Sequence, residues 1–187
     1  VMAPSPCTEL TAGDRLALLQ LARQAVAVEL GSEGHRLPEG RSPALAMKRG
    51  VFVTLTRAGA LRGCIGTLES DQPLWHSGPD CARGAAFRDP RFPPLVDEEL
   101  SEVCVEISVL TRPEPLSVNT REELKQQLRP GIDGLLIEED VQRATFLPQV
   151  WEQLARPEDF LNHLFRKAGL PADYWSGRLR CSRYQCI

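Results

Sequence analysis

The stretch VFVTLTRAGALRGCIGTL, residues 51–68, decides the fold class. Its first six residues are rich in β-branched and aromatic side chains, and residues 61–68 form a second strand-like segment. Between them, Arg57-Ala58-Gly59-Ala60 is a short connection in which Gly59 can adopt a positive φ angle. Because a short hairpin joins antiparallel strands, this stretch predicts an antiparallel sheet.

The segments on either side of this hairpin predict helices and further strands. Apolar residues at helical spacing predict a helix over residues 11–30, and Thr11 with Asp14 forms a capping box at its start. A second helix is expected within 74–88, although Gly78-Pro79 should break or delay it. The remaining predicted elements are a strand at 103–109, a helix at 120–128, a hairpin of 132–137 with 143–147, a helix at 157–169 and a strand at 180–187. This order favours an α+β protein, in which helices flank antiparallel sheet, over a doubly wound α/β fold.

Length and composition restrict the class of protein. A chain of 187 residues with 42% hydrophobic and 25% charged residues can form one globular domain with a substantial core. These values exclude a disordered chain, a collagen-like repeat and a disulfide-dense miniprotein. The net charge of −3 argues against a general binder of the nucleic-acid backbone, which would carry a basic surplus.

The cysteines predict free thiols in a reducing compartment. The six are spread over the chain: Cys7, Cys64, Cys81, Cys104, Cys181 and Cys186. None forms a CxxC pair, and the three histidines are isolated, so we expect neither a metal site nor a cofactor. With no secretory signal ahead of them and no apolar run of about 20 residues, we expect a cytoplasmic protein that does not cross a membrane.

The segment from Arg62 to Thr67 is the strongest candidate for function. Two glycines, Gly63 and Gly66, weaken a strand unless they accommodate a bulge or the close approach of another group. In a regular strand, Arg62 and Cys64 share one face with Gly66, and a guanidinium beside a thiol favours the reactive thiolate. The gap at Gly66 would leave room for a ligand. The alternative is that Cys64 packs as a small hydrophobic residue and that the glycines mark a bulge alone.

A second candidate is the loop Phe87-Arg88-Asp89-Pro90-Arg91-Phe92. Prolines stiffen it, and two arginines can bind a carboxylate or phosphate through paired hydrogen bonds. We expect Arg88, Asp89 and Arg91 to fold toward the 62–67 strand, unless the arginines pair with nearby acids instead. Glu106 either pairs with an arginine or faces solvent. Gln149, next to Pro148, either presents its amide at a cleft or stabilises a turn.

Several motifs in order along the chain resemble the AMMECR-type family, called protein A of the AmmeMemoRadiSam system in bacteria and archaea. They are GVFVTL (50–55), LRGCIGT (61–67), AAFRDPRFPPL (85–95), ISVL (107–110), GIDG (131–134), ATFLPQVW (144–151), KAGL (167–170) and YW (174–175). The resemblance spans nearly the whole chain and implies a single domain over residues 1–187 that starts with a flexible segment, 1–10. It also implies two unequal lobes, the larger built from both chain ends. Gly78-Pro79 departs from the family, whose corresponding helix usually runs unbroken.

The resemblance implies partners but no established activity. The family is associated with a Memo-like protein and a radical SAM protein, and its RGCIG segment is commonly taken to be functional. Our first hypothesis is therefore an accessory module whose cleft binds a small anionic ligand or a partner segment. The expected cleft residues are Arg62, Gly63, Cys64, Ile65, Gly66, Thr67, Arg88, Asp89, Arg91 and Gln149. The alternatives are an enzyme that uses Cys64 as a nucleophile or redox thiol and, with less support, a nucleic-acid-binding protein.

Overall fold

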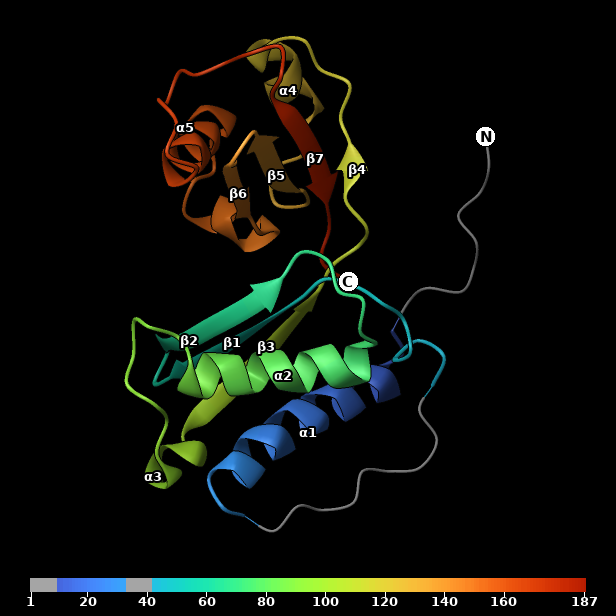
Figure 1. The fold of residues 1–187 in the computed structure, drawn as a ribbon, viewed down its shortest axis with the longest axis vertical. Coiled ribbons are helices and arrows are strands. Elements are labelled where there is room, and N and C mark those ends of the chain that lie inside the picture. Colours follow the sequence, from blue (N-terminus) through green and yellow to red (C-terminus); the bar gives the residue numbers. More distant parts are fainter. Residues whose placement is uncertain (1–9, 33–41) are drawn as a thin grey trace. The chain divides into compact units, whose positions relative to one another are not determined.

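The computed structural model describes residues 10–32 and 42–187, and the chain divides into two compact units (Figure 1). Unit 1 runs to Leu110 and includes the last residue, Ile187, whereas unit 2 comprises Thr111–Cys186. Every pair of strands is antiparallel, so the predicted α+β class with a larger lobe built from both chain ends is confirmed. The predicted flexible segment lies outside the described residues except for Leu10, which is only 5% exposed.

Unit 1 contains a three-stranded sheet in the order β2-β1-β3. Its strands are β1 (Val51–Arg57), β2 (Ala60–Thr67) and β3 (Val103–Val109). The predicted hairpin is present, because Ala58 and Gly59 turn the chain with φ angles of 50° and 79° and Arg57 pairs with Ala60. Positive φ at both turn residues gives the backbone twist that a two-residue hairpin requires.

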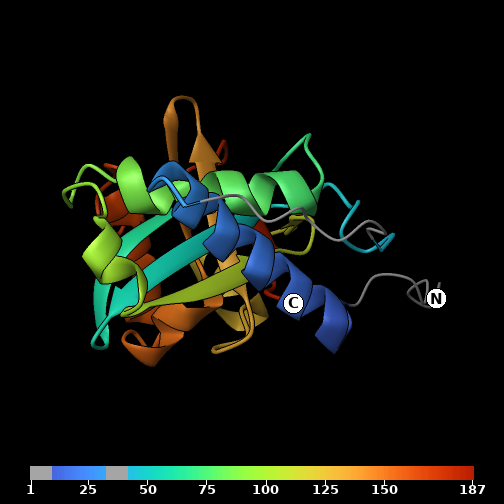
Figure 2. The same cartoon turned by 90° about the horizontal axis from the view of Figure 1, so that it is seen from below.

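Two helices, α1 (Ala12–Glu29) and α2 (Leu74–Phe87), lie side by side over one face of this sheet (Figures 1 and 2). The predicted capping box at Thr11 and Asp14 begins α1. Alternate residues of β1 point at the helices, and Val51, Val53 and Leu55 are completely buried. The opposite face of the sheet thus carries the intervening residues of each strand.

The expectation that Gly78-Pro79 would break or delay the second helix is wrong. The helix begins at Leu74 and continues through Pro79, although a proline inside a helix costs about 3 kcal/mol. Burial outweighs this cost, because α2 inserts Ala82, Ala85 and Ala86 into the core.

Unit 2 contains a four-stranded sheet in the order β4-β7-β5-β6. Its elements are β4 (Glu114–Pro115), α4 (Arg121–Gln127), β5 (Gly134–Glu139), β6 (Gln142–Phe146), the 3-10 helix η1 (Pro148–Glu152), α5 (Pro157–Lys167) and β7 (Arg180–Tyr184). The buried face of α5 supplies Phe160, whose ring stacks on Trp151 at a centroid distance of 3.8 Å. This unit therefore has its own hydrophobic core.

The described residues contain no disulfide, and none of their helices could span a membrane. Cys64, Cys81, Cys104, Cys181 and Cys186 are all free thiols, and Cys7 lies outside the described residues. Within 10–32 and 42–187, every helix is too short or too polar to cross a bilayer.

Candidate functional site

A β-bulge in β2 decides where the side chains of the RGCIG segment point. Leu55 pairs with Gly63 and Thr56 pairs with Leu61, so Arg62 is an extra residue without a partner in β1. The predicted irregularity is therefore present, but it lies at Arg62 rather than at a glycine. Because a bulge interrupts the alternation of a strand, Arg62 is removed from the regular pattern that Cys64 follows.

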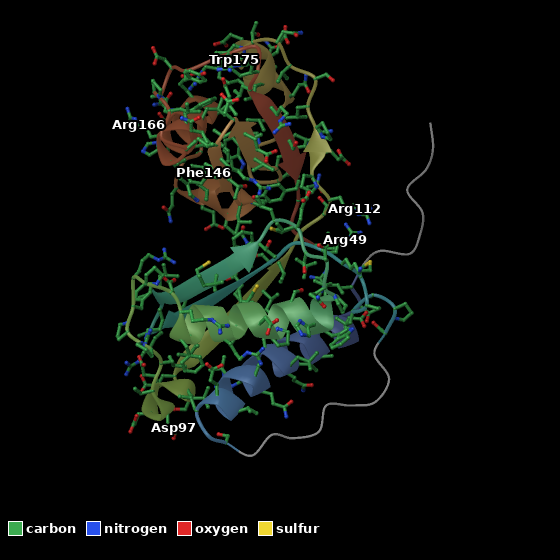
Figure 3. All side chains as sticks on the ribbon, viewed as in Figure 1. Arg49, Asp97, Arg112, Phe146, Arg166 and Trp175 are labelled. Atoms are coloured by element: carbon green, nitrogen blue, oxygen red, sulfur yellow. The ribbon has the colours of Figure 1, made fainter. Side chains whose placement is uncertain are left out.

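Arg62 is bound by a carboxylate and does not accompany the thiol. Its Nε and Nη2 atoms donate to the two oxygens of Glu99 at 2.8 and 2.7 Å, and the residue is only 9% exposed. Glu99 lies on the four-residue helix α3 (Asp97–Leu100), whose first residue is labelled in Figure 3. The expectation that Arg62 stands beside the Cys64 thiol on one face is thus wrong, because its guanidinium is bound by Glu99.

Glu99 binds a second arginine as well. Its Oε1 atom accepts from Arg57 at 3.1 Å, and the hydrogen bond from Arg62 is the largest of the causes that lower the pKa of Glu99 from 4.5 to about 2. This cluster, in which Arg62 and Glu99 are buried and Arg57 is exposed, ties the end of the β1–β2 hairpin to α3. Its role is structural.

Gly63 and Ile65 face the helices and belong to the core. A Cβ atom on Gly63 would lie 2.0 Å from the carbonyl oxygen of Ala85, so only glycine lets α2 approach β2 this closely. Ile65 packs against Gly84 in the same helix. The predicted close approach at Gly63 therefore comes from the backbone of a helix, and neither residue lines an open cleft.

Cys64 and Gly66 occupy the other face of the sheet, away from the helices. The gap at Gly66 is not room for a ligand, because the Phe52 ring on the neighbouring strand fills it and would lie 2.3 Å from an added Cβ atom. Thr67 ends the strand, and its hydroxyl donates to the carbonyl oxygen of Glu69. Of the predicted segment, only Cys64 thus presents a reactive group on this face.

A polar row crosses the sheet through Cys64. Thr54 pairs with Cys64 on one side and with Glu106 on the other, so one polar side chain comes from each strand. The Thr54 hydroxyl lies 3.4 Å from the Cys64 sulfur and donates to it. Cys64 and Thr54 are half-buried, whereas Glu106 is exposed, which resolves the open question of its environment.

The loop after α2 closes the outer edge of β2 at Cys64. One oxygen of Asp89 accepts the Cys64 N–H at 2.9 Å, and the Arg91 guanidinium reaches the Cys64 carbonyl oxygen at 3.4 Å. Asp89 and Arg91 also pair with each other through hydrogen bonds of 2.9 and 2.7 Å. The two side chains together thus satisfy both backbone groups of Cys64, as a neighbouring strand would. We call them the Asp89–Arg91 clip.

Within the clip, the Arg91 guanidinium that we expected to bind an anion is already paired with the Asp89 carboxylate. The hydrogen bond from Arg91 is the main cause that holds the pKa of Asp89 far below its usual range, and the same bond raises the pKa of Arg91. The side chain of Asp89 is 2% exposed and that of Arg91 is 55% exposed. Arg88 is also exposed and makes no ion pair with the acids of the described residues. Of the three charged side chains in this loop, Arg88 and the outer surface of Arg91 therefore remain available to a ligand.

Gln149, the last of the predicted site residues, lies in unit 2. It lines a cavity of about 590 Å³ together with Trp151, Gln185 and Cys186. Its side-chain oxygen lies 3.9 Å from the Cys186 sulfur. Gln149 therefore lies at a concave surface of unit 2, and its place in a ligand-binding cleft stays a prediction.

Comparison with known proteins gives the same family that the sequence motifs resemble. The AMMECR1 family model matches residues 19–187. The chain belongs to the AMMECR1 family.

Relatives of this AMMECR1-family protein are similar over most of their length. A protein of Methanothermobacter thermautotrophicus is 42% identical over 175 residues, which cover 90% of this chain and 89% of the relative. One from Methanosarcina barkeri is 40% identical, with 89% of this chain and 84% of the relative covered. The crystal structure of the uncharacterized protein PH0010 from Pyrococcus horikoshii matches with a TM-score of 0.82 at 37% identity, over 90% of this chain and 87% of that one.

Two residues that contact the 62–67 segment were not identified from the sequence motifs. Thr54 contacts the Cys64 sulfur, and Glu99 holds Arg62. Counting back from the Ala58-Gly59 turn predicts the partners of β1, but the bulge shifts the register by one residue beyond that turn. Glu99 carried no signal, because acids are common on short surface helices. In the described ranges, no three His, Cys, Asp or Glu side chains gather as they would around a metal ion.

Proposed function

We propose that this AMMECR1-family protein is a binding module that presents Cys64 to a small ligand or a partner segment. Its surface consists of Cys64 and Thr54 on the sheet face away from α1 and α2, with Arg91, which reaches the Cys64 carbonyl oxygen, at its edge and Arg88 exposed in the same loop. We propose further that it acts in the cytoplasm as an accessory to a Memo-like protein and a radical SAM protein.

One observation carries this proposal: the Asp89–Arg91 clip binds both backbone groups of Cys64, and the register puts its half-buried thiol on the sheet face away from α1 and α2. A side chain on such a fixed backbone loses little conformational freedom when it binds. The clip also leaves part of the Arg91 guanidinium exposed, so a ligand that carries a carboxylate or phosphate gains a hydrogen-bond partner nearby.

The contact between Thr54 and Cys64 favours a second candidate function, in which Cys64 acts as a nucleophile. The Thr54 hydroxyl donates to the sulfur and so orients it on the sheet face, and cysteine sulfur is intrinsically a strong nucleophile. In such a step the thiol proton leaves to solvent and the sulfur adds to a carbonyl carbon of the ligand. The electron pair of the C=O π bond moves to the oxygen, which takes a proton from solvent.

Native mass spectrometry tests the binding function. The tagged protein is purified from its native host under mild conditions, as wild type, as Cys64→Ser and as Thr54→Val, and retained molecules and co-purifying proteins are identified. We expect the wild type to retain a small molecule or the Memo-like protein, and Cys64→Ser to lose it. The control is Cys104→Ser, which makes the same change on β3 outside the polar row. Equal retention by wild type and Cys64→Ser would contradict the proposed surface.

A mass increase on Cys64 separates the two candidates. A covalent adduct that is lost in Cys64→Ser and reduced in Thr54→Val supports the nucleophile. A molecule released intact on denaturation supports reversible binding.

A further inference from the structure

The outer edge of β3 is open along its centre. In an antiparallel sheet, alternate residues of an edge strand turn their N–H and C=O groups outward. The carbonyl oxygen of Val103 accepts from Arg23 at 2.9 Å, and that of Val109 accepts from the N–H of Ile187 at 2.8 Å. The alternation therefore also turns Val105 and Ile107 outward. Among residues 10–32 and 42–187, none hydrogen-bonds their outward groups.

The two edges of the sheet thus differ. The Asp89–Arg91 clip closes β2 at Cys64. Arg23 and Ile187 close only the ends of β3 and leave its middle residues unpaired. Exposed strand edges are ready templates for another strand, and proteins usually cover them when they have no use for them.

An apolar groove lies directly beside this open edge. It has a volume of about 230 Å³ and lies between α1 and β3, two elements that Figure 2 shows next to each other. Its wall on α1 includes Leu18 and Leu19, and its wall on β3 includes Val105 and Ile107. Arg15 is the charged residue of its wall on α1; Glu106 borders the groove from β3, although the alternation of the strand puts its side chain on the other face of the sheet. The groove is large enough for one or two aliphatic side chains.

We propose that an extended segment of a partner protein adds to β3 as a fourth strand and places apolar side chains in this groove. The N–H and C=O groups of Val105 and Ile107 pair with its backbone. Residues of the segment opposite Val105 and Ile107 face α1 and enter the groove. The residue between them lies opposite Glu106, on the other face of the sheet, because side chains alternate. The segment therefore has the pattern apolar, basic, apolar.

Ile187 already uses this mode of binding within the chain. Its N–H pairs with the carbonyl oxygen of Val109, and its side chain lines the same groove. The proposed segment continues this pairing along the strand from Val109 toward Val103.

Charge argues against a second copy of the chain as the occupant. Two β3 strands that paired antiparallel around their centres would place Glu106 opposite Glu106 of the other copy. Like charges directly opposite each other in a sheet are destabilising, whereas a lysine or arginine opposite Glu106 is favourable. A basic residue in a different protein satisfies this position.

Titration with two synthetic peptides tests the proposal. The probes are acetyl-Thr-Ile-Lys-Ile-Thr-amide and its counterpart with Glu in place of Lys, added to the full chain labelled with ¹⁵N. We expect the Lys peptide to shift the amide signals of Val105 and Ile107 in a saturable manner, with the Glu peptide binding about 10-fold more weakly. The Cys64 site is not probed by these signals, so failure of this proposal leaves the proposed function untouched.

Variants make the test specific. Glu106→Lys should reverse the preference toward the Glu peptide, and Val105→Pro should abolish binding because proline has no N–H. Glu98→Lys, the same change at an exposed position on α3, should alter neither. The proposal is overturned if neither peptide binds, if both bind equally, or if the same amides shift with protein concentration alone, as a second copy would cause.

Discussion

Replacing Gly63 by alanine tests whether the contact between β2 and α2 organises unit 1. The new Cβ atom would lie 2.0 Å from the Ala85 carbonyl oxygen and 3.0 Å from its carbonyl carbon. One of the two elements must move by about 1.5 Å to restore an ordinary van der Waals distance. The obstacle is the backbone of a helix, so no change of side-chain rotamer relieves it.

The size of the effect follows from two opposing contributions. Alanine normally stabilises a strand relative to glycine by roughly 0.5–1 kcal/mol. Overpacking a dense core costs about 1–3 kcal/mol and more where backbone must shift. We expect a net loss of about 2–3 kcal/mol, which for a chain of this size lowers Tm by roughly 4–12 °C.

Thermal unfolding and hydrogen exchange of residues 74–87 measure this loss. The matched control is Gly13→Ala on α1, where the nearest atom is 3.7 Å from the added Cβ and the change should raise stability by up to about 1 kcal/mol. An unchanged Tm and unchanged exchange in Gly63→Ala would refute the role assigned to this contact.

Three further predictions concern the charged contacts and the thiols. Glu99→Gln should lower the free energy of unfolding at pH 7 and weaken its dependence on pH between 4.5 and 2. The native pKa of Glu99 is about 2, so the ionised carboxylate contributes its full stabilisation above pH 4.5 and loses it as the pH falls toward 2; urea unfolding across this range measures the difference. Asp89→Asn should raise the exchange rate of the Cys64 amide about 10-fold or more, since it removes the charge from the clip; NMR exchange rates that match the wild type would contradict this. In native protein, iodoacetamide should label Cys64 faster than Cys181, because burial raises the pKa of Cys181 to about 12; peptide mapping checks the order.

Local patterns were sufficient for most of the fold. The Ala58-Gly59 turn, the Thr11–Asp14 capping box and the alternation in 103–109 act over a few residues, so the sequence specifies them directly. Pro79 shows the limit of such reasoning, because packing of α2 against both α1 and the sheet overrides a local penalty.

The site depended on contacts between residues far apart in sequence. The approach of Asp89 to Cys64 was anticipated, but the partner of Arg62 was not. A single extra residue in β2 sends Arg62 to Glu99 and leaves Cys64 beside Thr54. No periodicity in the sequence reveals that register, since it depends on how β2 meets α2.

The Asp89–Arg91 clip bears on how the protein avoids misassembly. A strand edge covered by a histidine or an ordinary carboxylate would become exposed when a cell compartment acidifies. Here Arg91 holds the pKa of Asp89 far below its usual range, so the Asp89–Arg91 clip keeps its ion pair at neutral pH and in acidified cell compartments alike. Newly folded molecules that meet at high concentration therefore find the Cys64 position of β2 already occupied, and fibril growth from that position is blocked by two side chains of the chain itself.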